Sequence, residues 1–286
     1  MNEPMPTDSF AVRVAKAVAG TGPMCAGIDP SVQLLEHWDL ATDAGGLRTF
    51  GMRCIEAFAG VVPVVKPQVA FFERCGSAGI AALEAVIAAA REAGLIVIAD
   101  AKRGDVDSTV EAYASAWLDP DSPLAADAVT AVAYLGMGAL RPLFDLAARH
   151  GNGVIVVARS SNPEGRRLQQ AQCDGGAGPS VEDLVLAEVA ALNHGGLPVS
   201  GAVGAVVGAT LAPSGYPLGD LGGTILAPGV GAQGGGAAQV AALFSACPPG
   251  SVLASSSRSV LAAGPDVKEL AAAARRCRDE MTAALA

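Results

Sequence analysis

The chain has 286 residues, of which 51 % are hydrophobic and 16 % charged, so it can bury a substantial core in one large α/β domain or two small ones. Its formal net charge of −9 argues against a general nucleic-acid binder, because such proteins present a basic face to phosphate groups. The negative sign does not exclude an anionic small-molecule substrate, because a local pocket can carry the opposite charge.

Short β-branched runs alternate with longer helical patterns along the chain, which is typical of β/α units around a parallel sheet. Apolar runs predict eight strands, at residues 24–29, 61–66, 95–101, 128–133, 153–158, 202–208, 224–227 and 252–255. Helical periodicity predicts helices at residues 79–93, 108–117, 140–150, 181–193, 237–245 and 266–284. A closed (β/α)8 TIM barrel requires eight such strands, so we expect an α/β fold with a single barrel domain over residues 1–286.

Three local features refine this expected barrel. An amphipathic segment at residues 9–18 precedes the first strand and is expected to form an extra N-terminal helix that closes the barrel bottom. Ser108 with Glu111 three residues later resembles a capping box at the start of a helix. The Gly- and Pro-rich segment between the sixth and seventh strands is short, so the sixth helix is expected to be a single turn or absent.

The other composition signals point to a chain without membrane spans, disulfides or metal. Residues 195–257 contain only Asp220 as a charged residue, but Gly and Pro interrupt every apolar run before it reaches the length of a spanning helix. The six cysteines form no CxxC pair, and we expect no secretory signal, so they are interpreted as reduced thiols of a cytoplasmic protein. His37, His150 and His194 lie far apart, which argues against a histidine metal site or a Ser-His-Asp triad.

Polar residues follow six of the eight predicted strands. Active sites of barrels lie at the carboxyl ends of the strands, and a set of polar residues at those ends is difficult to attribute to packing. The pattern therefore favours a single functional constellation, made of Asp29, Lys66, Asp100, Lys102, Ser160, Ser161, Gln233 and Arg258.

The most specific signal is the segment IADAKRGDVDST at residues 98–109. Asp100 and Lys102 are two apart in an extended segment, so their side chains leave the same face of the strand, and Asp105 follows in the next loop. An isolated D-x-K-x-x-D pattern is more often a structural ion-pair network. Here Lys66 supplies a second cation from the adjacent strand, which favours a functional array of alternating lysines and aspartates.

A second signal is the Gly-rich segment LAPGVGAQGGG at residues 226–236. Such a loop lets backbone N–H groups converge on an anion, although Gly-rich turns alone are weak evidence. Together with SSSR at residues 255–258, it matches the phosphate site that barrels often form after their last two strands. Arg258 can hold two phosphate oxygens, and Gln233 can donate from the loop.

These motifs resemble those of the orotidine 5′-monophosphate decarboxylases. The resemblance rests on GIDPS at residues 27–31, VVKPQVAFFE at 64–73, DAKRGD at 100–105, SNPEG at 161–165, APGVGAQGG at 227–235 and SSSR at 255–258. They occur in order over nearly the whole chain, and the KPQVAFFE signature resembles the bacterial subfamily common in mycobacteria and their relatives. The resemblance implies conversion of orotidine 5′-monophosphate to UMP, without metal or cofactor, in a homodimer with shared active sites.

The resemblance also implies roles for the charged residues. Lys102 is expected to donate a proton to the ring carbon left as a carbanion, and Asp100 to lie against the substrate carboxylate and disfavour the ground state. Lys66 and Asp105 complete the array, and the resemblance places Asp105 and Thr109 in the active site of the neighbouring subunit.

Further residues are implied to bind the nucleotide. Asp29 is expected to contact the ribose hydroxyls together with the lysine of the second strand. Ser161 is expected to bind the amide edge of the pyrimidine, and Gln233, Gly234 and Arg258 to hold the phosphate end.

The sequence differs from the family pattern at two places, and two alternative functions remain open. VTAVAYLG at residues 129–136 lacks the Pro and polar residue expected after the fourth strand, and the sixth β/α unit is short. One alternative is a Mg²⁺-dependent phosphosugar decarboxylase or aldolase of the same barrel lineage, and the other is a non-catalytic nucleotide-binding barrel. The first is disfavoured by the KPQVAFFE context and the second by the intact charged residues.

Overall fold

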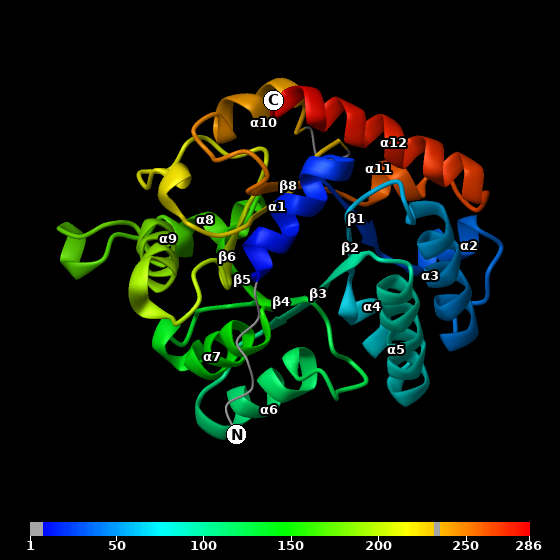
Figure 1. The fold of residues 1–286 in the computed structure, drawn as a ribbon, viewed down its shortest axis with the longest axis horizontal. Coiled ribbons are helices and arrows are strands. Elements are labelled where there is room, and N and C mark those ends of the chain that lie inside the picture. The colour runs from blue at the N-terminus through cyan, green and yellow to red at the C-terminus, as the bar shows by residue number, and fades with distance from the viewer. Residues whose placement is uncertain (1–7, 232–234) are drawn as a thin grey trace.

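A computed structural model describes residues 8–231 and 235–286 as a closed barrel of eight parallel strands (Figure 1). Each strand pairs with the next in chain order, and β8 closes the ring against β1. The (β/α)8 prediction is confirmed. The strands are β1 (Met24–Ile28), β2 (Val64–Pro67), β3 (Ile96–Arg103), β4 (Ala128–Ala131), β5 (Gly153–Arg159), β6 (Val203–Val207), β7 (Ile225–Pro228) and β8 (Val252–Ser256).

Helices surround the barrel in the order expected for β/α units (Figure 1). The α-helices are α1 (Phe10–Thr21), α2 (Val32–His37), α3 (Ala44–Phe58), α4 (Val69–Glu73), α5 (Gly76–Glu92), α6 (Asp107–Leu118), α7 (Arg141–His150), α8 (Arg166–Gln169), α9 (Val181–Ala191), α10 (Ala237–Phe244), α11 (Arg258–Leu261) and α12 (Val267–Ala284). Shorter helical turns are η1 (Met137–Leu140), η2 (Pro163–Gly165), η3 (Asp174–Gly176), η4 (Leu192–Gly196) and η5 (Leu218–Asp220).

Helix α1 lies across one end of the barrel, as the N-terminal amphipathic segment predicts (Figure 1). Phe10 and Val14 are fully buried and join the inward-facing strand residues in a core separate from the larger layer between barrel and helices. Arg13, on the same helix, pairs with Asp127 at 2.5 Å just before β4. The barrel bottom is therefore closed, which leaves the carboxyl ends of the strands as the accessible end.

The sixth β/α unit contains only the single turn η5 between β6 and β7, which confirms the prediction of a shortened unit. Helix α9 continues directly into the π-helical turn η4. Among the described residues, no helix combines the length and apolar character needed to cross a membrane.

Two local predictions were wrong. Strand β2 begins at Val64 rather than residue 61, because Val61 and Val62 form turn hydrogen bonds to the carbonyl of Phe58. The capping box at Ser108 does not form, since α6 begins one residue earlier and Val106 occupies its N-cap position without a side-chain hydrogen bond.

The helices between β1 and β2 were not predicted from the sequence. Helix α3 contains Gly51, where an added Cβ would lie 2.3 Å from a methyl carbon of Val86 on α5. Close approach of the two helices therefore requires a glycine at this position. Glycines such as Gly51 also weaken the apolar periodicity from which helices are predicted.

Candidate active site

A cavity of about 290 Å³ opens at the carboxyl ends of the strands. Its lining comes from all eight strands or from the residues that directly follow them. Seven of the eight predicted strand-end residues line it, namely Asp29, Lys66, Asp100, Lys102, Ser160, Ser161 and Arg258. The parallel barrel therefore gathers in one place side chains that lie far apart in the sequence.

Asp100 is the centre of the charged part of this cavity. Its Oδ2 accepts hydrogen bonds from Lys66 Nζ at 2.8 Å and Gln68 Nε2 at 2.9 Å. Its Oδ1 accepts from Lys102 Nζ at 2.6 Å and Thr130 Oγ1 at 2.9 Å. Two donors on each oxygen satisfy a buried carboxylate, which otherwise costs several kcal/mol to remove from water.

The charge states of this cluster are fixed by its geometry. Burial disfavours the charged form of Asp100, but the positive charges of Lys66 and Lys102 outweigh it and hold the pKa of that carboxyl well below its usual range. Burial likewise disfavours a charged Lys66, yet Asp100 and Asp29 raise the pKa of its ammonium above its usual value. Asp100 and Lys66 are therefore both ionised at neutral pH.

The backbone at Lys102 adopts the left-handed conformation, with φ at 47°, which is unfavourable for a side chain of this size. Contacts of the Lys102 backbone and of the next residue, Arg103, hold this conformation. The Lys102 N–H donates to Thr130 Oγ1 at 2.9 Å, and Arg103 pairs with Glu73 and lies 5.7 Å from the ring centroid of Tyr113. This conformation keeps the Lys102 ammonium at the cavity, and its side chain is 49 % exposed while that of Asp100 is 9 % exposed.

Hydrogen-bonding groups flank the charged cluster, after β1 on one side and after β5 on the other. Asp29 Oδ1 is buried and has no hydrogen-bond partner among the described residues, so it can accept from a bound molecule. Ser160 and Ser161 directly follow β5 and line the cavity together with Asn162. These groups can recognise hydroxyls and an amide edge.

A third part of the cavity lies after β7 and β8. Gly229 has a φ of 100° and lines the cavity with Val230, whose carbonyl accepts from Ser256 Oγ at 3.3 Å. Arg258 is exposed at the cavity, and within the described part of the chain its guanidinium has no hydrogen-bond partner. A loop with such a backbone, beside a free guanidinium, can bind an anion. The predicted phosphate ligands Gln233 and Gly234 lie outside the described residues.

Comparison with known proteins agrees with this geometry. Residues 24–273 match the model of the family described as orotidine 5′-phosphate decarboxylase / HUMPS. The chain belongs to this family. An orotidine 5′-phosphate decarboxylase from Salinispora arenicola is 51 % identical over 97 % of this chain and 99 % of its own. The one from Corynebacterium efficiens is 49 % identical over 92 % of this chain and 94 % of its own.

A solved structure supports the same assignment of fold and family. The crystal structure of a candidate orotidine 5′-phosphate decarboxylase from Streptomyces avermitilis has a TM-score of 0.90 to this chain and 46 % sequence identity. The match covers 98 % of this chain and 97 % of that one. The match to the family therefore extends over the whole barrel.

Two predicted site residues do not line the cavity of the single chain. Asp105 accepts the backbone N–H of Val106 at 2.9 Å, and Thr109 is exposed on α6. Two other residues were missed, since Gln68 and Thr130 both bind Asp100 directly. Gln68 stands two residues after Lys66 and so shares its side of an extended segment, a signal that was present in the sequence. Thr130 lies within an apolar strand and offers no comparable signal.

Among the described residues, no group of three or more His, Cys, Asp and Glu side chains is arranged to hold a metal ion.

Proposed function

We propose that this chain decarboxylates orotidine 5′-monophosphate to UMP, the last step in the de novo synthesis of pyrimidine nucleotides, by fixed charges alone. The observation that carries the proposal is the buried carboxylate of Asp100, held ionised between two ammonium groups in the lining of the cavity. Relatives that bear the name of this activity, at 51 % and 49 % identity over nearly the full chain, indicate the substrate.

The proposed reaction breaks the bond between the pyrimidine ring and its carboxylate. The electron pair stays on the ring carbon, carbon dioxide leaves, and Lys102 donates a proton from Nζ to that carbon. Asp100 lies against the substrate carboxylate and disfavours the ground state. The ammonium of Lys102 is most favourable when negative charge has developed on the ring, so its effect falls mainly on the transition state.

The remaining cavity residues are proposed to bind the nucleotide. The unpaired Oδ1 of Asp29 accepts a ribose hydroxyl, and Lys66 lies beside it. Ser161 binds the pyrimidine amide edge. Arg258 holds the phosphate with Gln233 and Gly234. Phosphate binding lies away from the reacting bond, yet its energy can order the site and offset desolvation of the ring.

We further propose that the active protein is a homodimer in which Asp105 and Thr109 complete the site of the neighbouring subunit. The loop that carries Asp105 also exposes Val106, which is 44 % accessible. It lies against the loop after β4, where Tyr134 is 79 % and Leu135 53 % accessible. Exposed apolar side chains of this size favour burial against a partner. Sedimentation showing a fully active monomer would remove this part of the proposal.

The six cysteines are all free thiols, which supports a cytoplasmic site of action. The decisive experiment is the ultraviolet absorbance of orotidine 5′-monophosphate incubated with purified, EDTA-treated protein. Loss of the substrate band with formation of UMP is the expected result. Tight UMP binding without turnover would indicate a binding protein. Neither turnover nor UMP binding, with activity on a phosphosugar once Mg²⁺ is added, would indicate the metal-dependent alternative.

A further inference from the structure

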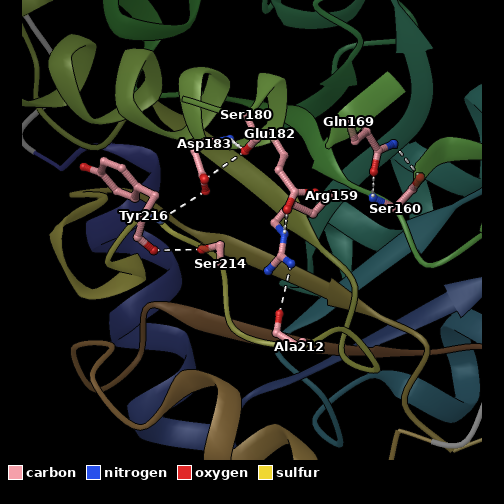
Figure 2. A network of polar contacts seen from close by, with 9 residues as sticks. All are labelled: Arg159, Ser160, Gln169, Ser180, Glu182, Asp183, Ala212, Ser214 and Tyr216. Carbon is pink, nitrogen blue, oxygen red and sulfur yellow. Dashed lines mark hydrogen bonds and ion pairs between the residues drawn. The ribbon is translucent and has the colours of Figure 1, made fainter. Parts of the chain in front are cut away.

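A buried ion pair, Arg159–Glu182, directly precedes Ser160 and Ser161 in the chain and shares no residue with the charged cluster at Asp100. Figure 2 shows this pair with its neighbours. Arg159 is the last residue of β5 and is 3 % exposed, and its Nε lies 3.1 Å from Oε1 of Glu182 in the first turn of α9. Glu182 is 7 % exposed. Arg159 Nη2 also donates to the carbonyl of Ala212 at 2.9 Å. The guanidinium therefore joins β5, α9 and the segment after β6.

An irregularity in β5 turns Arg159 away from the barrel interior. Val157 pairs with Val206, both of which line the cavity, but Arg159 pairs with Val207 rather than with the residue after it. Between these two pairs β5 advances by two residues while β6 advances by one, so β5 has a bulge at this point. The bulge places Arg159 on the face opposite to the one that strict alternation would give it. Val207 belongs to the outer core, and Arg159 accordingly faces α9.

The segment after β6 is held at a second point by the same helix. Asp183 Oδ1 accepts the backbone N–H of Tyr216 at 3.0 Å, and Ser180 donates to the other oxygen of Asp183 at 2.8 Å (Figure 2). Ser214 Oγ donates to the carbonyl of Tyr216 at 2.8 Å. Residues 212–216, which lack a regular helix of their own, are therefore fixed to the start of α9 and to Arg159.

Arg159 is separated from the cavity by no intervening residue, because the next residue, Ser160, lines it. The Gly208 N–H donates to the carbonyl of Arg159 at 2.9 Å, and a Cβ placed on Gly208 would lie 3.3 Å from Cβ of Ser161. On the other side, Gln169 bonds both the N–H and the hydroxyl of Ser160, at 3.0 and 2.7 Å (Figure 2). Arg159 therefore anchors the backbone at the point where the Ser160–Ser161 segment begins.

Compared with a packed apolar pair, the Arg159–Glu182 ion pair is expected to contribute to the positioning of neighbouring segments rather than to stability. Two well-packed apolar side chains in place of a buried ion pair often stabilise a protein equally or more. An apolar pair, however, cannot reach the carbonyl of Ala212 and fix its direction. Arginine can make both contacts, because Nη2 donates to that carbonyl while Nε lies against the carboxylate of Glu182. Among the described residues, Nε and Nη1 have no hydrogen-bond partner, so the pair is held by charge and by the single hydrogen bond of Nη2.

We propose that Arg159, oriented by Glu182, is a positioning residue for the Ser160–Ser161 wall of the cavity, and that it sets how the pyrimidine ring is presented to Lys102. This inference rests on the proposed decarboxylase function. Small displacements of a reacting group cost large factors in rate, even when the displaced contact is remote from the chemistry. Arg159 does not line the cavity, so its effect is expected to fall on kcat rather than on binding of the phosphate end.

The test compares Arg159→Met, Glu182→Gln and the double variant Arg159→Met/Glu182→Leu with the wild-type chain. Arg159→Met is expected to lower kcat at least about tenfold, while KM stays within about threefold because Arg258 still holds the phosphate. The double variant is expected to recover the melting temperature lost in Arg159→Met, without recovery of kcat. Glu182→Gln keeps the size of the side chain and is expected to lower kcat in the same direction.

The matched control is Arg13→Met, which removes an ion pair at the closed end of the barrel. It is expected to lower the melting temperature with kcat unchanged. Recovery of both stability and kcat in the double variant would overturn the proposal, since the pair would then serve stability alone. If Arg159→Met does not fold, an unchanged kcat in both Glu182→Gln and the double variant would likewise overturn the proposal. Failure of the wild-type chain to form UMP would instead refute the proposed function.

Discussion

Replacement of Asp100 by Asn tests the charged cluster through stability as well as activity. Each carboxylate oxygen of Asp100 accepts from two donors, and an amide has only one oxygen. In either orientation of the Asn side chain, two donors therefore lose their acceptor. Lys66 also loses its closest counter-charge, and its side chain is only 7 % exposed.

Removal of one partner of a buried ion pair costs about 3–5 kcal/mol, because the other charge remains buried. We expect Asp100→Asn to fall near the lower end, at about 3 kcal/mol, since the second partner Lys102 is half-exposed and can be solvated. Urea unfolding at pH 7 measures this loss, and kcat is expected to become undetectable. A loss of stability below about 1 kcal/mol would refute the reasoning, because such a value is typical of an exposed pair.

The pH dependence of this difference has a defined sign. The folded pKa of Asp100 is lowered, so its contribution to stability is present above the unfolded value of about 3.9 and is lost as the pH falls below it. The folded pKa of Lys66 is raised, so its contribution is present below about 10.4 and is lost at higher pH. The stability gap between the wild-type chain and Asp100→Asn is therefore expected to be flat from about pH 5 to 9.

Asp127→Asn is the matched control for this substitution. Asp127 also combines an ion pair with a backbone hydrogen bond, accepting from Arg13 at 2.5 Å and from the N–H of Val97 at 2.9 Å. It lies directly before β4, away from the cavity at the carboxyl ends of the strands. The control is expected to lose some stability and to keep its kcat, which separates damage to the fold from damage to the site.

Three further outcomes follow from the site. Thr130→Val keeps the shape of the side chain but removes its bonds to Asp100 and to the strained backbone of Lys102, so steady-state assays are expected to show roughly tenfold lower kcat at similar KM. Arg258→Ala is expected to lose at least about tenfold in kcat/KM, on the scale of about 1.5–3 kcal/mol for a charged hydrogen bond, and an unchanged value would place the phosphate elsewhere. Mixing inactive Lys102→Ala with inactive Asp105→Ala is expected to restore about a quarter of wild-type activity, since half of the dimers are mixed and each has one intact site. No recovery after subunit exchange would contradict a shared site.

The barrel and most of its site could be predicted from the sequence because both follow from local pattern. Strand and helix periodicities specify the order of elements, and a closed parallel barrel brings all strand ends to one side. Asp29, Lys66 and Arg258 are far apart in the chain, yet the position of each at a strand end was enough to place them at the same cavity.

Other features depend on three-dimensional detail that a single sequence does not specify. Thr130 binds Asp100 from the neighbouring strand, and this contact depends on a register that shifts between Ala99 and Arg103. The Arg159–Glu182 pair depends on the bulge in β5, without which alternation would direct Arg159 into the barrel. Bulges reverse which face a side chain occupies, and nothing in the residue types around position 158 announces one.

The most direct test of the account is the activity of Lys102→Ala measured beside its affinity for UMP. Lys102 is the proposed proton donor, and its ammonium has no substitute at the cavity, because Lys66 is buried and bonded to Asp100. The account predicts that turnover of orotidine 5′-monophosphate is abolished while UMP binding stays largely intact. A kcat near that of the wild-type chain would contradict it.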